Sequence, residues 1–154
     1  MGTGAYDPWQ DADARSDVDV VIDPALPPGR GDAWWIRMLR AIAIRDGLHP
    51  THRRCVLAHE LVHVDADDDQ LAGHGPDGTR LGRRQEQRAD RTAARRLIRL
   101  QDLVAAIATH PADPAAVAHE LDVTQHVLRT RLEHLHDAER ATLAAAILEV
   151  DAAA

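Results

Sequence analysis

His59-Glu60-Leu61-Val62-His63 is the stretch of this sequence on which the prediction of its fold and function depends. Residues four apart lie on the same face of an α-helix, so two His side chains at this spacing can reach one metal ion. A Glu directly after the first His can take a proton from water beside that ion. We therefore predict His59 and His63 as metal ligands and Glu60 as the catalytic base.

The residues around this motif favour a helix. Residues 52–64 contain no Gly or Pro, Thr51 can cap the N-terminal end, and apolar residues recur at helical spacing at Val56, Leu57, Leu61 and Val64. The chain has 10 His residues, so a chance match is a real alternative. A second segment, Ala118-His119-Glu120-Leu121, repeats the residues at 58–61 and serves as a comparison. There Val123 stands where the second His would be, so this segment cannot chelate a metal by the same pattern.

A third ligand is predicted on a second helix. Residues 83–103 also lack Gly and Pro, and Glu86 and Asp90 share one face while the other side is rich in Arg. Glu86 can complete a site of two His and one Glu that leaves a fourth position for water. Asp90, one turn later, can accept a hydrogen bond from a ligating His. The alternative is an ordinary amphipathic helix whose acidic side chains pair with neighbouring Arg residues.

The two segments together resemble a known family. His59-Glu60-x-x-His63 followed by Glu86-x-x-Ala89-Asp90-x-x-Ala93-Ala94-x-x-Leu97-Ile98 is similar to the ImmA/IrrE metallopeptidases and, more broadly, to the thermolysin-like zincins. The match extends over roughly residues 18–136. The resemblance implies Zn²⁺ held by His59, His63 and Glu86, with Asp90 as their helper. It also implies cleavage of a helix-turn-helix repressor, which releases genes of mobile elements or stress responses.

Composition limits the classes of protein that the chain can represent. With 154 residues it is expected to form one domain, and its net charge of −7 argues against general nucleic-acid binding. It has no long apolar run and no export signal, so we expect a cytoplasmic protein with no membrane contact. Cys55 is the single cysteine, which suits a reducing compartment. It lies one turn before His59 and either faces the metal or is a small buried apolar residue.

The order of elements predicts an α+β fold. Residues 1–17 are expected to be a flexible N-terminus, residues 18–110 the metallopeptidase core and residues 111–154 a C-terminal helical subdomain. Strands are predicted at residues 18–23 and 41–44, in a small antiparallel β-sheet packed against the two zinc-site helices. A loop at residues 70–82 contains His74, which either assists an oxyanion or is a surface residue.

The C-terminal subdomain resembles a helix-turn-helix in its pattern over residues 115–135. It lacks a basic recognition face apart from Arg129 and Arg131, so we predict a packing or substrate-docking role in preference to DNA binding. An Ala-rich helix is expected from residue 138 to the end.

Two classes of function remain open. The first is a zinc endopeptidase of the gluzincin type that acts on a repressor. The second is a regulatory module that contains zinc and displaces a repressor or another partner without proteolysis. Glu60 favours the enzyme, because a purely structural site of two His and one Glu does not need a base beside its ligands.

Overall fold

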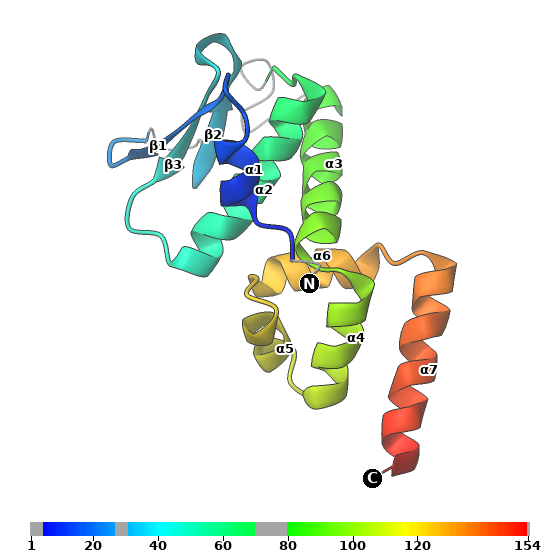
Figure 1. The fold of residues 1–154 in the computed structure, drawn as a ribbon. Coiled ribbons are helices and arrows are strands. Elements are labelled where there is room, and N and C mark those ends of the chain that lie inside the picture. The colour runs from blue at the N-terminus through cyan, green and yellow to red at the C-terminus, as the bar shows by residue number, and fades with distance from the viewer. Residues whose placement is uncertain (1–4, 27–30, 70–79, 154) are drawn as a thin grey trace.

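The computed structural model describes residues 5–26, 31–69 and 80–153. Three strands and helices α1 to α3 form one end of the molecule, and helices α4 to α7 form the other end (Figure 1). The fold is therefore α+β, as predicted. Within the described ranges, none of the helices combines the length and the apolar character that crossing a membrane requires.

The sheet is mixed, so the prediction of a purely antiparallel sheet is wrong. Its strands are β1 (Asp19–Asp23), β2 (Ala33–Ile36) and β3 (Ala41–Arg45), in the order β1-β3-β2. β2 and β3 are antiparallel, whereas β1 and β3 are parallel. The chain reverses between β1 and β2 and again between β2 and β3, so β1 and β3 run in the same direction on neighbouring positions.

The N-terminal segment contains a helix, which differs from the flexible segment predicted for residues 1–17. Helix α1 (Pro8–Asp13) begins after Asp7, whose side chain accepts a hydrogen bond from the backbone in the first turn. Arg15 follows the helix and donates a hydrogen bond to Asp65, at the end of the zinc-motif helix, over 2.6 Å. This ion pair and the burial of Ala12 attach the N-terminal helix to the core.

Helix α2 (Pro50–Ala66) carries the first motif and lies between two hydrophobic cores. Its cap is His49, one residue before Pro50, and not the predicted Thr51. One side of α2 packs against the sheet through apolar residues of both elements: Leu57, Leu61 and Val64 of α2 with Trp35, Ile42 and Ile44 of the sheet. Burial on two sides holds this helix in place along most of its length.

The other side of α2 packs against α3 (Arg80–Leu97). Ala58 and Val62 of α2 belong to the same core as Ala89 and Ala93 of α3, and all four are buried. Small side chains let two helix axes approach closely. This close packing brings the acidic face of α3 within reach of the His residues on α2.

The second predicted helix, residues 83–103, is broken in the structure. α3 ends at Leu97, and α4 (Leu100–Thr109) begins after Arg99, whose ψ of 148° is extended. The buried Arg131 side chain donates a hydrogen bond to the carbonyl of Ile98 over 3.0 Å and pairs with Glu139 at 2.6 Å. The Arg131 side chain of a later helix thus supplies a hydrogen-bond donor to the Ile98 carbonyl, which lies at the break between α3 and α4.

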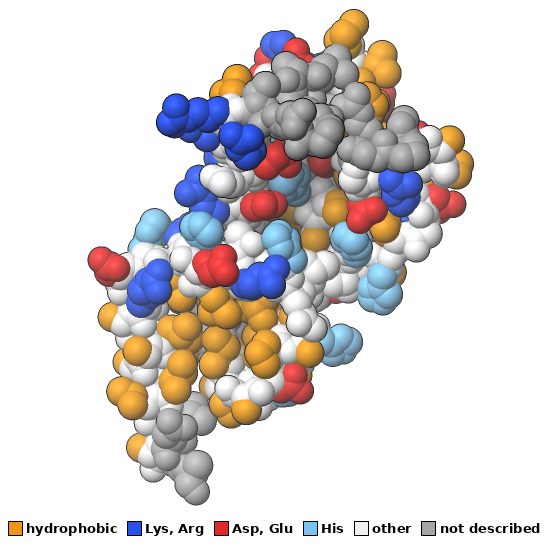
Figure 2. Space-filling view, turned by 180° about the vertical axis from the view of Figure 1, so that it is seen from behind, with side chains coloured by type: hydrophobic (Ala, Val, Ile, Leu, Met, Phe, Trp, Pro, Cys, Tyr) orange, Lys and Arg blue, Asp and Glu red, His pale blue; other side chains and the backbone are white. Residues whose placement is uncertain are grey.

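The C-terminal part contains the two helices predicted at residues 115–135, namely α5 (Pro114–Glu120) and α6 (Gln125–Glu133), followed by α7 (Asp137–Ala153). The side chain of Thr124 caps α6. α6 packs against α3, so this part of the chain lies next to the zinc-motif helices (Figure 1). Figure 2 shows hydrophobic side chains gathered over the α4 to α7 end on one face. The domain boundary at residue 110 stays a prediction.

Replacing Arg131 by Ala is expected to lower the free energy of unfolding by about 2–4 kcal/mol, because the Ile98 carbonyl and Glu139 both lose a charged partner. Arg129→Ala, at an exposed position of the same helix, is the control and should change stability by less than about 0.5 kcal/mol. Urea unfolding followed by circular dichroism measures both values. Equal stability of the two variants would contradict the proposed role of Arg131 at the helix break.

Candidate metal centre

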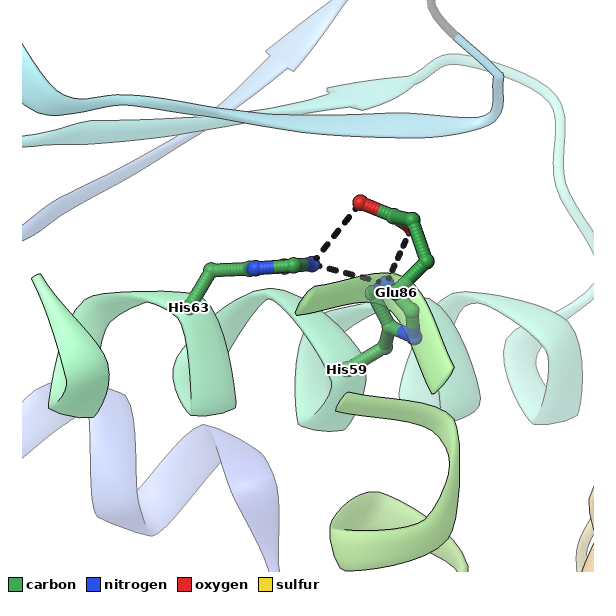
Figure 3. A group of neighbouring side chains, drawn as sticks. All are labelled: His59, His63 and Glu86. Atoms are coloured by element: carbon green, nitrogen blue, oxygen red, sulfur yellow. Dashed lines mark hydrogen bonds and ion pairs between the residues drawn. The ribbon is translucent and has the colours of Figure 1, made fainter. Parts of the chain in front are cut away.

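Three predicted ligands come together between α2 and α3 (Figure 3). His59 and His63 project from α2, and Glu86 reaches them from α3. The Nε2 atoms of the two His residues are 3.0 Å apart. Oxygens of Glu86 lie 3.2 Å from Nε2 of His59 and 3.3 Å from Nε2 of His63. Donor atoms of three residues on two different helices therefore converge on one point.

These distances suit a tetrahedral metal ion. Zinc binds imidazole nitrogen and carboxylate oxygen at about 2.0–2.2 Å, so neighbouring ligands of a tetrahedral site lie roughly 3.4 Å apart. The observed separations of 3.0, 3.2 and 3.3 Å are close to that value. Two imidazoles and one carboxylate are also the donor set of catalytic zinc sites, which keep a fourth position open.

The hydrogen bonds behind the two imidazoles determine which of their atoms carry lone pairs. Nδ1 of His59 lies 2.9 Å from Asp90, and Nδ1 of His63 lies 2.8 Å from Asp68. A carboxylate can only accept, so each Nδ1 donates its proton and each neutral ring keeps a lone pair on Nε2. Two lone pairs 3.0 Å apart, with a carboxylate beside them, repel unless a cation lies among them. A proton or a metal ion among these atoms would relieve this repulsion.

Asp90 makes the contact that the sequence analysis predicted for it, with Nδ1 of His59. Its position one turn after Glu86 on α3 places both carboxylates beside the same His. Such contacts fix the tautomer and the orientation of a ligating His. The functional role of Asp90 stays a prediction.

Asp68 is a residue that sequence reasoning missed, because a run of acidic residues such as 65–69 usually indicates a solvated surface. It is 5% exposed and holds Nδ1 of His63. Asp67 has a φ of 52°, and the Asp68 N–H donates to the carbonyl of His63 over 3.0 Å, in a Schellman ending of α2. This turn folds Asp68 back along the helix, and the side chains of Gln85 and Arg88 on α3 bond to it as well. An Asp five residues after a ligating His, just beyond a helix end, is the signal that could have identified it.

Glu60 lies beside the ligands, and its carboxylate also contacts the sheet. It is 5% exposed, and its Oε2 accepts a hydrogen bond from the backbone N–H of Trp35 in β2 over 2.9 Å. Burial raises the pKa of Glu60, while the charges of His59 and His63 lower it in part. A carboxylate with a raised pKa can accept and return a proton near neutral pH.

Electrostatic coupling within the cluster is strong. Burial alone would lower the pKa of His59, but hydrogen bonds to Asp90 and Glu86 and the charge of Glu60 raise it to about 10. Burial would raise the pKa of Glu86, yet hydrogen bonds to His59 and His63 hold it well below its usual range. The acidic surroundings therefore favour a positive charge at this point, either as a proton or as a metal ion.

A pocket of about 500 Å³ opens at the cluster and is lined in part by His59, Glu60 and Glu86. Figure 2 shows the surface hollowed between the two ends of the molecule, with His and acidic side chains around the hollow. His126 of α6 also lines the pocket and lies 3.9 Å from Asp90. Sequence reasoning assigned no function to this His.

The remaining candidates lie elsewhere or outside the described ranges. Cys55 is buried in the core and lines the pocket, but it is not part of the ligand cluster. His74 lies outside the described residues, so both alternatives given for it, an oxyanion role and a surface position, stay open. Trp35, which was not a candidate, is fully buried in the core, and its backbone N–H contacts Glu60.

Comparison with protein-family models gives a match over residues 14–133 to the IrrE N-terminal-like domain, the family of M78 peptidases. The chain belongs to this family. The resemblance inferred from the two motifs is thereby confirmed, and membership implies a metallopeptidase. The cluster of His59, His63 and Glu86 is consistent with the family's site.

A solved structure has the same fold. It is titled a Mycobacterium tuberculosis transcriptional regulator, with a TM-score of 0.63 and 21% identity. The match covers 88% of this chain but only 43% of the regulator, so the family member described here spans less than half of that protein's length. At this identity the likeness concerns the fold alone. Among curated proteins, none matches the chain.

Asp68→Ala and Asp90→Ala are each expected to weaken zinc binding by about 10- to 100-fold, because each removes the carboxylate that orients one ligating His. Competition with a chromogenic chelator measures the affinity. Asp69→Ala, at the exposed neighbour of Asp68, is the matched control and should bind zinc like the wild type. An affinity of Asp68→Ala equal to that of Asp69→Ala would rule out the role assigned to Asp68.

Zinc binding at pH 7 is expected to release about one proton per ion. The pKa of His59, raised to about 10, means that the metal-free protein holds a proton there at pH 7, and the metal must displace it. Below pH 10 the affinity should therefore fall as pH falls, by about tenfold per unit for one proton. Calorimetry in two buffers with different ionisation enthalpies measures the release. Identical heats in both buffers would contradict the expected protonation.

Proposed function

We propose that this protein is a zinc-dependent endopeptidase that cleaves a helix-turn-helix repressor in the cytoplasm. The observation that carries the proposal is the convergence of two imidazole lone pairs and the Glu86 carboxylate beside a buried Glu60, at the wall of an open pocket. Membership of a peptidase family supports the same reaction class.

Each side chain has a chemical task in this proposal. A zinc ion held by His59, His63 and Glu86 would supply Lewis-acid polarisation of a peptide carbonyl and of a water molecule. Glu60 takes the proton from the attacking water and passes it to the leaving amine. The Trp35 N–H fixes one oxygen of Glu60 and so orients the carboxylate. Asp90 and Asp68 keep the two imidazoles turned toward the metal position.

The proposal includes the substrate class, which is supported by charge and by the family. The net charge of −7 favours association with a basic protein, and DNA-binding repressors are basic where they contact phosphate. Members of the family that the sequence resembles act on repressors of this kind. The fold neighbour in Mycobacterium tuberculosis is itself titled a transcriptional regulator, which is in keeping with a role in gene control.

Glu60→Gln is expected to reduce proteolysis by about 10²- to 10⁴-fold while zinc content stays unchanged, because the variant removes the base and keeps every ligand. The test is co-expression with the helix-turn-helix repressor encoded nearest the gene, followed by mass spectrometry of the repressor. The wild type should produce a discrete cut.

The chain supplies a matched control for this experiment. Glu120→Gln changes the Glu of the second His-Glu pair, which lies on α5 and bonds His110 at 2.8 Å, away from the ligand cluster. This variant should cut like the wild type. The alternative result is that the intact repressor is released from its DNA to the same extent by the wild type and by Glu60→Gln. In that case the protein is the binding module that displaces a partner without proteolysis.

A further inference from the structure

The pocket at the metal centre continues along α2 toward the N-terminal end of that helix. Cys55 and Val56 line it one turn before His59, which is a distance of about 5.4 Å along the helix axis. Val127 of α6 and Ala33 at the start of β2 also line it. This part of the pocket thus has apolar side chains from three different elements.

Several polar groups that line the same pocket already have partners within the protein. Asp32 pairs with His52 at 3.3 Å. The Thr124 hydroxyl accepts the backbone N–H of Val127 at 3.3 Å. His126 lies 3.3 Å from Arg129 and 3.9 Å from Asp90. A charged guest would have to break these contacts or lie unpaired against apolar walls, which is costly, whereas an apolar guest gains from burial.

We propose that this pocket binds an aliphatic side chain of the substrate next to the bond that is cut, and that Val127 is a specificity-determining residue. The inference rests on the proposed function, because it takes the scissile carbonyl to lie at the cluster of His59, His63 and Glu86. Residues of an extended peptide are about 3.3 Å apart, so a side chain adjacent to that carbonyl reaches a site one helical turn away. The C-terminal helical part then selects substrate through α6.

The probes are three N-acetyl amino-acid hydroxamates, which chelate zinc through the same group and differ only in the side chain: glycine, leucine and aspartate. Calorimetry with the zinc-loaded full chain measures their dissociation constants. The leucine compound is expected to bind at least about tenfold more tightly than the glycine compound, since added methylene groups in an apolar pocket give gains of this size. The aspartate compound should bind no better than glycine.

Two substitutions test the role of Val127. Val127→Trp fills the pocket and should reduce the preference for leucine over glycine to within about twofold. Val127→Ala is a milder change that tests the same residue if Val127→Trp does not fold. It should lower the preference for the leucine compound over the glycine compound about threefold or more. Val21→Trp, on the exposed strand β1 away from the pocket, is the control and should keep the full preference.

The outcomes separate this inference from the proposed function. If the wild type binds all three hydroxamates equally, or if both Val127 variants keep the leucine preference, the metal centre stands and the proposed subsite is overturned. If the protein binds no zinc and none of the hydroxamates, the proposed function fails and the inference fails with it.

Discussion

The burial of α2 between two cores is the constraint on which the rest of the structure depends. The sheet covers one side of the helix, and the small residues of α3 cover another. A helix held in this way cannot rotate about its axis without exposing Leu57 or Leu61 on one side or Ala58 on the other, all of which are fully buried. Its remaining face, with His59 and His63, is therefore fixed in direction. The close approach of α3 that this packing allows is also what brings Glu86 and Asp90 to the two imidazoles.

The site concentrates negative charge around the position between the two imidazoles, and this favours a positive charge there. Four carboxylates, from Glu60, Asp68, Glu86 and Asp90, surround two imidazoles. Glu60 lies on α2, Asp68 just after its C-terminal end, and Glu86 and Asp90 on α3, so the cluster depends on the packing of α2 against α3. Without a metal the same field keeps a proton on His59, as its raised pKa indicates. Proton binding and metal binding thus compete for one position, and this competition links occupancy of the site to pH.

Much of the fold and of the candidate metal centre could be predicted from the sequence. The features that were not predicted have physical causes. The shared face of His59 and His63, and that of Glu86 and Asp90, follow from helical periodicity, which is local, so the sequence carries both directly. The place of Asp68 depends on a left-handed residue at Asp67 that reverses the chain, and no periodicity reveals this. The break after Leu97 has no Gly or Pro to mark it and is stabilised by Arg131, which is 33 residues away from Ile98. The parallel pairing of β1 with β3 likewise depends on which neighbour β1 meets after the chain has folded.

The placement of α6 bears on the idea that the C-terminal part reads DNA. In a DNA-binding helix-turn-helix, the first residues of the second helix contact the bases. Here Thr124, His126 and Val127, at the start of α6, line the pocket beside the candidate metal centre, and the helix packs against α3. A DNA duplex placed on the start of α6 would lie over this pocket and its acidic side chains, which repel phosphate. The geometry therefore favours a role for α6 in holding a protein substrate, and it gives the helix-turn-helix pattern a place in the fold without requiring contact with nucleic acid.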